Sequence, residues 1–121
     1  MRRSQATKAR TLPRWRLLHG DEIALGPGKV ELLEAIAAAG SISGAARELE
    51  MSYRRAWLLV ETMNRRFRKP LVATSSCRRA GANLTREGVE VVALYRRIEA
   101  ESLAATRNAW SRIRSLLAKP G

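Results

Sequence analysis

Residues 40–64, GSISGAARELEMSYRRAWLLVETMN, contain two short helical patterns joined by a tight turn. The first pattern has Ser41 and Ser43 near its start, where a side-chain oxygen can cap exposed amides, and continues through Ala45 and Ala46. Two helices that cross steeply approach closely, so a bulky side chain at Ala46 would push the second helix out of register. The stretch therefore predicts a helix-turn-helix.

The turn is predicted at Glu50 and Met51. Glu50 occupies a position that often has positive φ and usually holds Gly or Asn, and Met51 should fill the core beneath it. Ser52 then caps a second helix, from Tyr53 to about Arg66. Its predicted buried face, spaced by three and four residues, comprises Ala56, Trp57, Val60, Met63 and Phe67. Predicted to face outward are Tyr53, Arg54, Leu58, Glu61 and Arg65.

The outward residues of this second helix have the chemistry of a DNA contact. When a helix-turn-helix docks, the first turn of its second helix enters the major groove, where Arg54 or Arg55 can donate two hydrogen bonds to guanine. Ser52 or Tyr53 can hold a phosphate, and Arg65 extends the basic surface along the helix. The alternative is a basic face that is only solvated.

A β-hairpin is predicted directly after the second helix. Pro70 stops the helix, 71–74 has the composition of a strand, and 82–84 can return as its partner. The intervening SSCRRAG loop places Arg78 and Arg79 at the tip, where they can contact phosphate or the minor groove. Between Thr62 and Arg86 there are seven basic residues and no acid, whereas a generic solvated loop would mix the two signs. Helix, basic loop and hairpin together predict a wing.

A hairpin and a helix are predicted before the central stretch. Alternating apolar residues around a Gly-Asp turn indicate two short strands within 14–25, and a helix follows over Lys29–Ala39, ended by Gly40. The buried face of this helix is predicted as Val30, Leu33, Ile36 and Ala37. Glu31 and Glu34 lie off that face and are predicted to be solvated charges.

One unbroken helix is predicted from Arg86 to Ala118, capped by Thr85. Val92, Tyr95 and Ile98 are expected to pack on the domain. A seven-residue repeat further along comprises Leu103, Thr106, Trp110, Ile113 and Leu117. Such a repeat implies a seam between helices, and its natural use is dimerisation; the alternative is packing back on the first hairpin.

Charge is the most unusual property of the composition. In 121 residues, 23 Lys and Arg stand against 11 Asp and Glu, a formal net charge of +12 that should attract polyanions. A membrane surface is the competing partner, but no apolar run approaches the roughly 20 residues of a spanning helix. The chain also lacks the apolar segment of a secretory signal, so the expected location is the bacterial cytoplasm, at the nucleoid.

The composition gives little support for catalysis or metal binding. Cys77 and His19 are too few for a common zinc site, the single cysteine excludes an intrachain disulfide, and no cofactor is predicted. No cluster of acid, base and nucleophile is present, so an enzyme is not expected. The predicted organisation is a disordered basic arm over 1–13, a winged helix-turn-helix domain over 14–84 and a dimerisation helix over 85–121, a mainly α fold with small β elements. The arm is either a solvated terminus or a tail that contacts phosphate or the minor groove.

The motifs ALGPGKVELLEAI, GSISGAARELEMSYRRAW, VETMN and LTREG together resemble the N-terminal DNA-binding domain of the molybdate-responsive, ModE-type regulators. In this region that family is itself similar to the LysR-type winged helix. The resemblance covers about Leu17 to Ile98. It implies that Ser43 and 52–55 lie at the DNA and that the helix from Thr85 onward forms a dimer.

Two departures from the ModE-type pattern limit what can be transferred. The family's wing is typically a run of glycines, whereas this chain has SSCRRAG, so the wing contacts and operator sequence are not carried over. Full-length members also have C-terminal molybdate-binding domains, which are not present before Gly121. Either the protein is a stand-alone winged helix or the sequence is a piece of a longer one, and the effector is unknown.

The sequence therefore predicts a homodimeric, sequence-specific regulator of transcription that binds double-stranded DNA. Two other functions fit some of the same features. A non-specific architectural DNA-binding protein would also explain the charge, and an interaction module for another regulator would explain the C-terminal helix.

Overall fold

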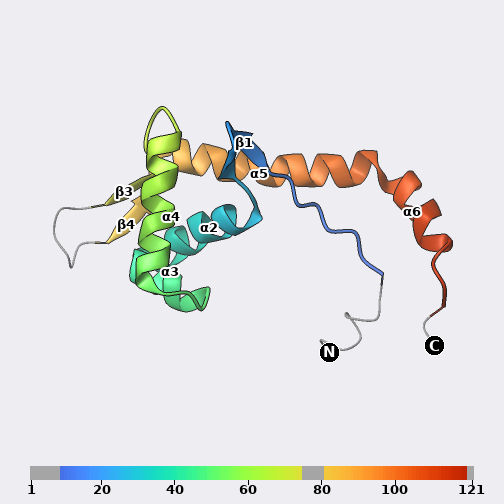
Figure 1. Ribbon diagram of the computed structural model, residues 1–121, viewed down its shortest axis with the longest axis horizontal. Coiled ribbons are helices and arrows are strands. Elements are labelled where there is room, and N and C mark those ends of the chain that lie inside the picture. Colours follow the sequence, from blue (N-terminus) through green and yellow to red (C-terminus); the bar gives the residue numbers. More distant parts are fainter. Residues whose placement is uncertain (1–8, 75–80, 120–121) are drawn as a thin grey trace.

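Helix α2 (Pro27–Ala39) lies at the centre of the fold, where helices α3 and α5 and strand β4 contact it (Figure 1). The computed structural model describes residues 9–74 and 81–119. In chain order the elements are β1 (Leu17–His19), β2 (Glu22–Leu25), α2, α3 (Ile42–Glu48), α4 (Tyr53–Arg66), β3 (Val72–Thr74), β4 (Ala82–Leu84), α5 (Arg86–Ala105) and α6 (Arg107–Ser115). This architecture confirms the predicted fold class.

The buried surface of α2 is wider than the predicted stripe. Val30, Leu33 and Ile36 are fully buried as expected, but so is Leu32, whereas Ala37 is exposed. The prediction for Ala37 was therefore wrong, and Leu32 is buried because α2 contacts neighbours on more than one side. Gly40 ends α2 as predicted, in the left-handed conformation with φ 73°.

The helix-turn-helix has the predicted geometry. The Ser41 side chain accepts a hydrogen bond from the Gly44 N–H at 3.0 Å, Ala45 and Ala46 are buried, and α3 contacts both α2 and α4. Glu50 has φ 55° and is the only non-glycine residue with positive φ among those described. Turning here lets the Met51 N–H reach the Ala46 carbonyl at 2.9 Å, and the half-buried Met51 side chain packs on the core.

The two hairpins are antiparallel, as predicted. Strand β3 pairs with β4 in the register Val72 with Leu84 and Thr74 with Ala82. The Ala82 N–H donates to the Gly40 carbonyl at 2.9 Å, which ties β4 to the end of α2. A Cβ atom at Gly81 would lie 2.2 Å from the Gly40 oxygen, so this close approach requires glycine.

Helix α5 begins against the wing and is anchored to the core by Tyr95. Thr85 caps α5 as predicted by accepting from the Gly88 N–H at 3.0 Å. Tyr95 is 4% exposed, packs with Leu25 and Val30, and donates its hydroxyl to the Trp15 carbonyl at 2.7 Å. Burial raises the pKa of this hydroxyl. Val92 also packs on the core, but Ile98 is 49% exposed, contrary to the prediction. Helix α5 continues past the rest of the domain (Figure 1).

The predicted unbroken C-terminal helix is wrong, because α5 ends before Thr106 and α6 starts after it. Thr106 has φ −104° and ψ 7°, and its hydroxyl donates to the Ser102 carbonyl at 2.6 Å. A threonine that bonds back to the carbonyl four residues earlier often bends a helix. The change of direction between α5 and α6 is visible in Figure 1.

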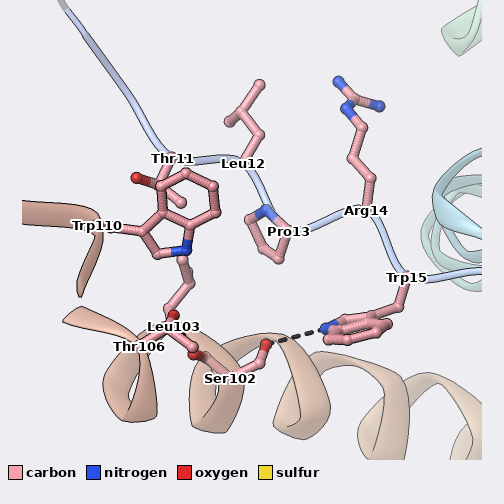
Figure 2. Close-up of a pocket in the computed structure, with 9 residues that line it drawn as sticks. All are labelled: Thr11, Leu12, Pro13, Arg14, Trp15, Ser102, Leu103, Thr106 and Trp110. Atoms are coloured by element: carbon pink, nitrogen blue, oxygen red, sulfur yellow. Dashed lines mark hydrogen bonds between the residues drawn. The ribbon is translucent and has the colours of Figure 1, made fainter. Parts of the chain in front are cut away.

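The segment before β1 runs along α5 and α6. The Trp15 indole donates to the Ser102 hydroxyl at 3.0 Å, and Arg114 donates to the Thr11 hydroxyl at 2.6 Å. A pocket of about 380 Å³ lies between the two parts of the chain (Figure 2). It is lined by Thr11, Leu12, Pro13, Arg14, Trp15, Ser102, Leu103, Thr106 and Trp110. Residues 1–8 of the predicted basic arm lie outside the described residues.

An ion pair joins α2 to α5. Arg96 donates to Glu34 through Nε at 2.9 Å and through Nη2 at 2.5 Å, and to Glu99 at 2.6 Å. The hydrogen bond from Arg96 lowers the pKa of the Glu34 carboxyl and raises the pKa of Arg96. Glu34 was predicted to be a solvated charge, and that was wrong because its partner lies 62 residues away in sequence.

We expect Glu34→Gln to lower the free energy of unfolding at pH 7 by roughly 0.5–1 kcal/mol, a small value because both side chains are about 40% exposed and screened by solvent. A lowered folded-state pKa stabilises the protein above the carboxyl's ordinary pKa, and this stability is lost as the pH falls through the folded value. Denaturant unfolding measured from pH 7 to pH 2 should show that the difference in unfolding free energy between the wild type and Glu34→Gln disappears at acid pH. Glu31→Gln, an exposed change on the same helix, is the control; a gap independent of pH would contradict the assignment.

Candidate nucleic-acid interface

Helix α4 has one side in the core and the opposite side free. Ala56, Val60 and Met63 are at most 3% exposed, which confirms three of the predicted buried residues. Phe67 is half-buried against the core, but Trp57 is 42% exposed and was placed wrongly. Trp57 lies about a quarter-turn from Ala56 around the helix, so the core covers only part of its indole.

The predicted DNA-contacting residues of α4 and its cap are all exposed. These are Ser52, Tyr53, Arg54, Arg55 and Arg65. Within residues 9–74 and 81–119, none of these three arginines forms an ion pair. Ser43, on α3, is exposed as well. The helix therefore presents unpaired positive charge on the side opposite the core.

A shallow groove of about 370 Å³ follows this side of α4. It is lined by Ser52, Arg54, Arg55, Leu58, Leu59 and Thr62. Ser52 Oγ accepts the Arg55 N–H at 3.1 Å, so its hydroxyl proton remains available to a phosphate oxygen. Cationic and hydroxyl groups thus share one open surface at the start of the helix.

The basic run from the last turn of α4 to Lys69 contains paired and unpaired residues. Arg66 pairs with Glu22 of β2, and Lys69 lies 3.9 Å from Glu87. Arg65 remains on the outward side. Charge counting alone could not separate these residues, because their acidic partners are distant in sequence.

Asn64 is a structural residue of the site that the sequence did not reveal. Its Oδ1 accepts the N–H groups of Leu71 at 2.9 Å and Val72 at 3.1 Å, and its Nδ2 donates to the Val72 carbonyl at 3.0 Å. These bonds attach β3 to the last turns of α4. Only the position of Asn64 before a strand could have indicated this role, and that signal is weak.

The tip of the wing lies outside the described residues, including Cys77, Arg78 and Arg79. The strands that carry the tip are described, and both are fixed to the helices: β3 to α4 through Asn64 and β4 to α2 through Gly40. The predicted contacts of Arg78 and Arg79 stay predictions.

The predicted dimerisation residues do not form one straight stripe. Leu103 belongs to α5, Trp110 and Ile113 belong to α6, and Thr106 lies at the break between them. All five are exposed, with Ile113 at 50% and Leu117 at 58%. Leu103, Thr106 and Trp110 line the pocket whose other wall is the N-terminal segment (Figure 2). No helix in the described part of the chain is long and apolar enough to span a membrane.

Three helices followed by an antiparallel hairpin, with the third helix exposed along one side, define a winged helix-turn-helix. The family model described as bacterial regulatory helix-turn-helix protein, lysR family, matches residues 28–89. The chain belongs to this family.

Curated relatives confirm the resemblance to ModE-type proteins. The molybdenum transport protein ModE of Azotobacter vinelandii is 39% identical over 101 residues, which cover 82% of this chain and 37% of that protein. The molybdenum-pterin-binding protein MopA of Rhodobacter capsulatus is 42% identical over 77 residues, which cover 62% of this chain and 29% of that protein. The DNA-binding transcriptional dual regulator ModE of Escherichia coli K12 is 39% identical over 71 residues, which cover 57% of this chain and 27% of that protein. The chain thus spans between 27% and 37% of the length of these three relatives.

Among solved structures, a crystal structure titled as a CbnR_DBD–DNA complex matches with a TM-score of 0.55. The match covers 73% of this chain and 95% of that chain at 24% identity, so it concerns the fold alone.

We expect Asn64→Ala to lower the free energy of unfolding by about 1–3 kcal/mol, because two half-buried amides and one carbonyl lose their partner. Hydrogen exchange at the Leu71 and Val72 amides should accelerate more than at amides inside α2. Asn83→Ala, on the exposed side of β4, is the matched control and should stay within about 0.5 kcal/mol. Equal effects of the two changes would show that Asn64 does not hold the wing.

Proposed function

We propose that the protein is a homodimeric regulator of transcription that binds double-stranded DNA in a sequence-specific way. The observation that carries the proposal is the outward side of α4, where Arg54, Arg55 and Arg65 are exposed opposite a fully packed side. Membership of a family described as regulatory helix-turn-helix proteins supports it, as does the net charge of +12.

In the proposed complex, α4 lies in the major groove. Arg54 and Arg55, at the start of the helix, are within one turn of each other and can donate to guanine O6 and N7. Ser43, Ser52 and Tyr53 contact phosphates that fix the register. The wing, with Arg78 and Arg79, follows the backbone or enters the adjacent minor groove.

The proposed dimer forms through α5 and α6. Apolar side chains are exposed there, and α5 extends beyond the domain (Figure 1). Two copies related by a two-fold axis would present two α4 helices about 34 Å apart, on one face of the DNA. An operator with two related half-sites is the expected consequence.

A non-specific architectural protein is the second candidate, favoured by the high positive charge. Selection of sequences from a genomic fragment library at several salt concentrations separates the two functions. A regulator enriches one motif that survives rising salt, whereas an architectural protein enriches none. Failure to enrich a motif would remove the main proposal.

We expect Arg54→Ala to relax the preference for one guanine of the selected operator by roughly 1–3 kcal/mol, since a two-bond contact to a base edge is lost. Arg65→Ala, three turns along the helix, is the control: it should weaken binding to all sequences alike through a lost phosphate contact. Titration of both variants on the operator and on a set of single-base substitutions measures this. Uniform weakening by Arg54→Ala would place Arg54 on phosphate.

We expect Ile113→Asp to raise the dimer dissociation constant at least tenfold, which is about 1.4 kcal/mol, because a charge would enter an apolar interface. Ile23→Asp is the matched control, with 42% exposure against 50% for Ile113 and a place on β2, outside both helices. Sedimentation equilibrium of both variants gives the constants. Equal dissociation constants for the wild type and Ile113→Asp would exclude α6 from the dimer.

A further inference from the structure

Leu58 stands out on the outward side of α4. It is 45% exposed and lies between Arg54, one turn before it, and Thr62, one turn after it. The core residues of α4 lie on the opposite side, and Leu58 is not among the described residues that pack on the core cluster. The exposure of this large apolar side chain beside Arg54 and Arg55 is therefore not explained by packing of the core.

The groove around Leu58 combines apolar and cationic walls. Leu58 and the half-buried Leu59 supply the apolar part, and Ser52, Arg54 and Arg55 supply the polar part. The Thr62 hydroxyl donates to the Leu58 carbonyl at 2.8 Å, so its proton is used within the helix. Among the described residues, the groove has no acidic side chain in its lining. Positive charge beside a small apolar surface fits a nucleic acid better than an apolar protein partner.

In the major groove of DNA, the C5 methyl of thymine is the apolar group that base edges present. From this chemistry and from the position of Leu58 one turn after Arg54, we propose that Leu58 is a specificity-determining residue that contacts the methyl group of a thymine. That thymine lies near the guanine bound by Arg54. This inference rests on the proposed sequence-specific binding and adds a second readable base to it.

The test replaces thymines of the selected operator, one at a time, by deoxyuridine, which lacks only the methyl group. Replacing one thymine per half-site, close to the guanine bound by Arg54, should lower the affinity of the wild-type protein for the operator by about three- to fivefold. With Leu58→Ala the same replacement should change nothing, because the apolar partner of the methyl group is gone. Leu94→Ala, a change at 46% exposure on α5, should keep the full loss.

A 5-methylcytosine arm separates the methyl group from the rest of the base. The wild type should bind an operator with a 5-methylcytosine–guanine pair at that position more tightly than one with a cytosine–guanine pair. Leu58→Ala should bind these two operators equally tightly. If Leu58→Ala unfolds, Leu58→Asn provides the same comparison.

The outcomes distinguish this inference from the function on which it rests. An operator that is selected but insensitive to deoxyuridine at every thymine overturns the role of Leu58 and leaves the regulator intact. The role of Leu58 is also overturned if deoxyuridine still lowers the affinity of Leu58→Ala for the operator. Failure to select any operator removes both proposals.

Discussion

The close contact between α3 and α4 is the constraint on which the rest of the structure depends. Ala45 and Ala56 are fully buried and Ala46 is 3% exposed, so small side chains occupy buried positions on both helices, which contact each other. The positive φ of Glu50 makes the sharp turn that allows this crossing. Because the crossing fixes how α4 is rotated, it decides which residues of α4 enter the core and which remain free. The exposed cationic side therefore depends on the contact between α3 and α4 and on the backbone angle of Glu50.

Local interactions made most of the fold predictable. The bounds of α4 follow from the Ser52 cap and from Pro70 beyond its end, and the turn at Glu50 follows from its position between two helical patterns. Contacts between distant residues were not predictable. Asn64 forms hydrogen bonds with the segment that leads into β3, beyond the end of α4, and Glu34 pairs with Arg96 on α5. No local sequence pattern indicates either contact. Trp57 was misplaced because hydrophobicity alone does not measure how wide the covered side of a helix is.

The C-terminal part shows a different limit of sequence patterns. A seven-residue repeat predicts a continuous stripe only if the helix is continuous, and a side-chain hydroxyl at Thr106 is enough to interrupt it. The N-terminal segment of the same chain also lies against this region, because Trp15 forms a hydrogen bond with Ser102 and Arg114 forms one with Thr11. A second copy that docks on Leu103 and Trp110 would therefore meet a surface that the N-terminal segment already borders (Figure 2).

The attachment of the wing has a consequence for the shape of the DNA. One strand of the wing is bonded to α4 and the other to the end of α2, and α2 is packed against α3. The distance between the helix that would enter the major groove and the strands beside it is therefore set before any DNA arrives. In a complex, a mismatch between that distance and the groove spacing must be absorbed mainly by the DNA, at a deformation cost that varies with sequence. In the proposed function, a protein built in this way would distinguish sites by their flexibility as well as by their base edges.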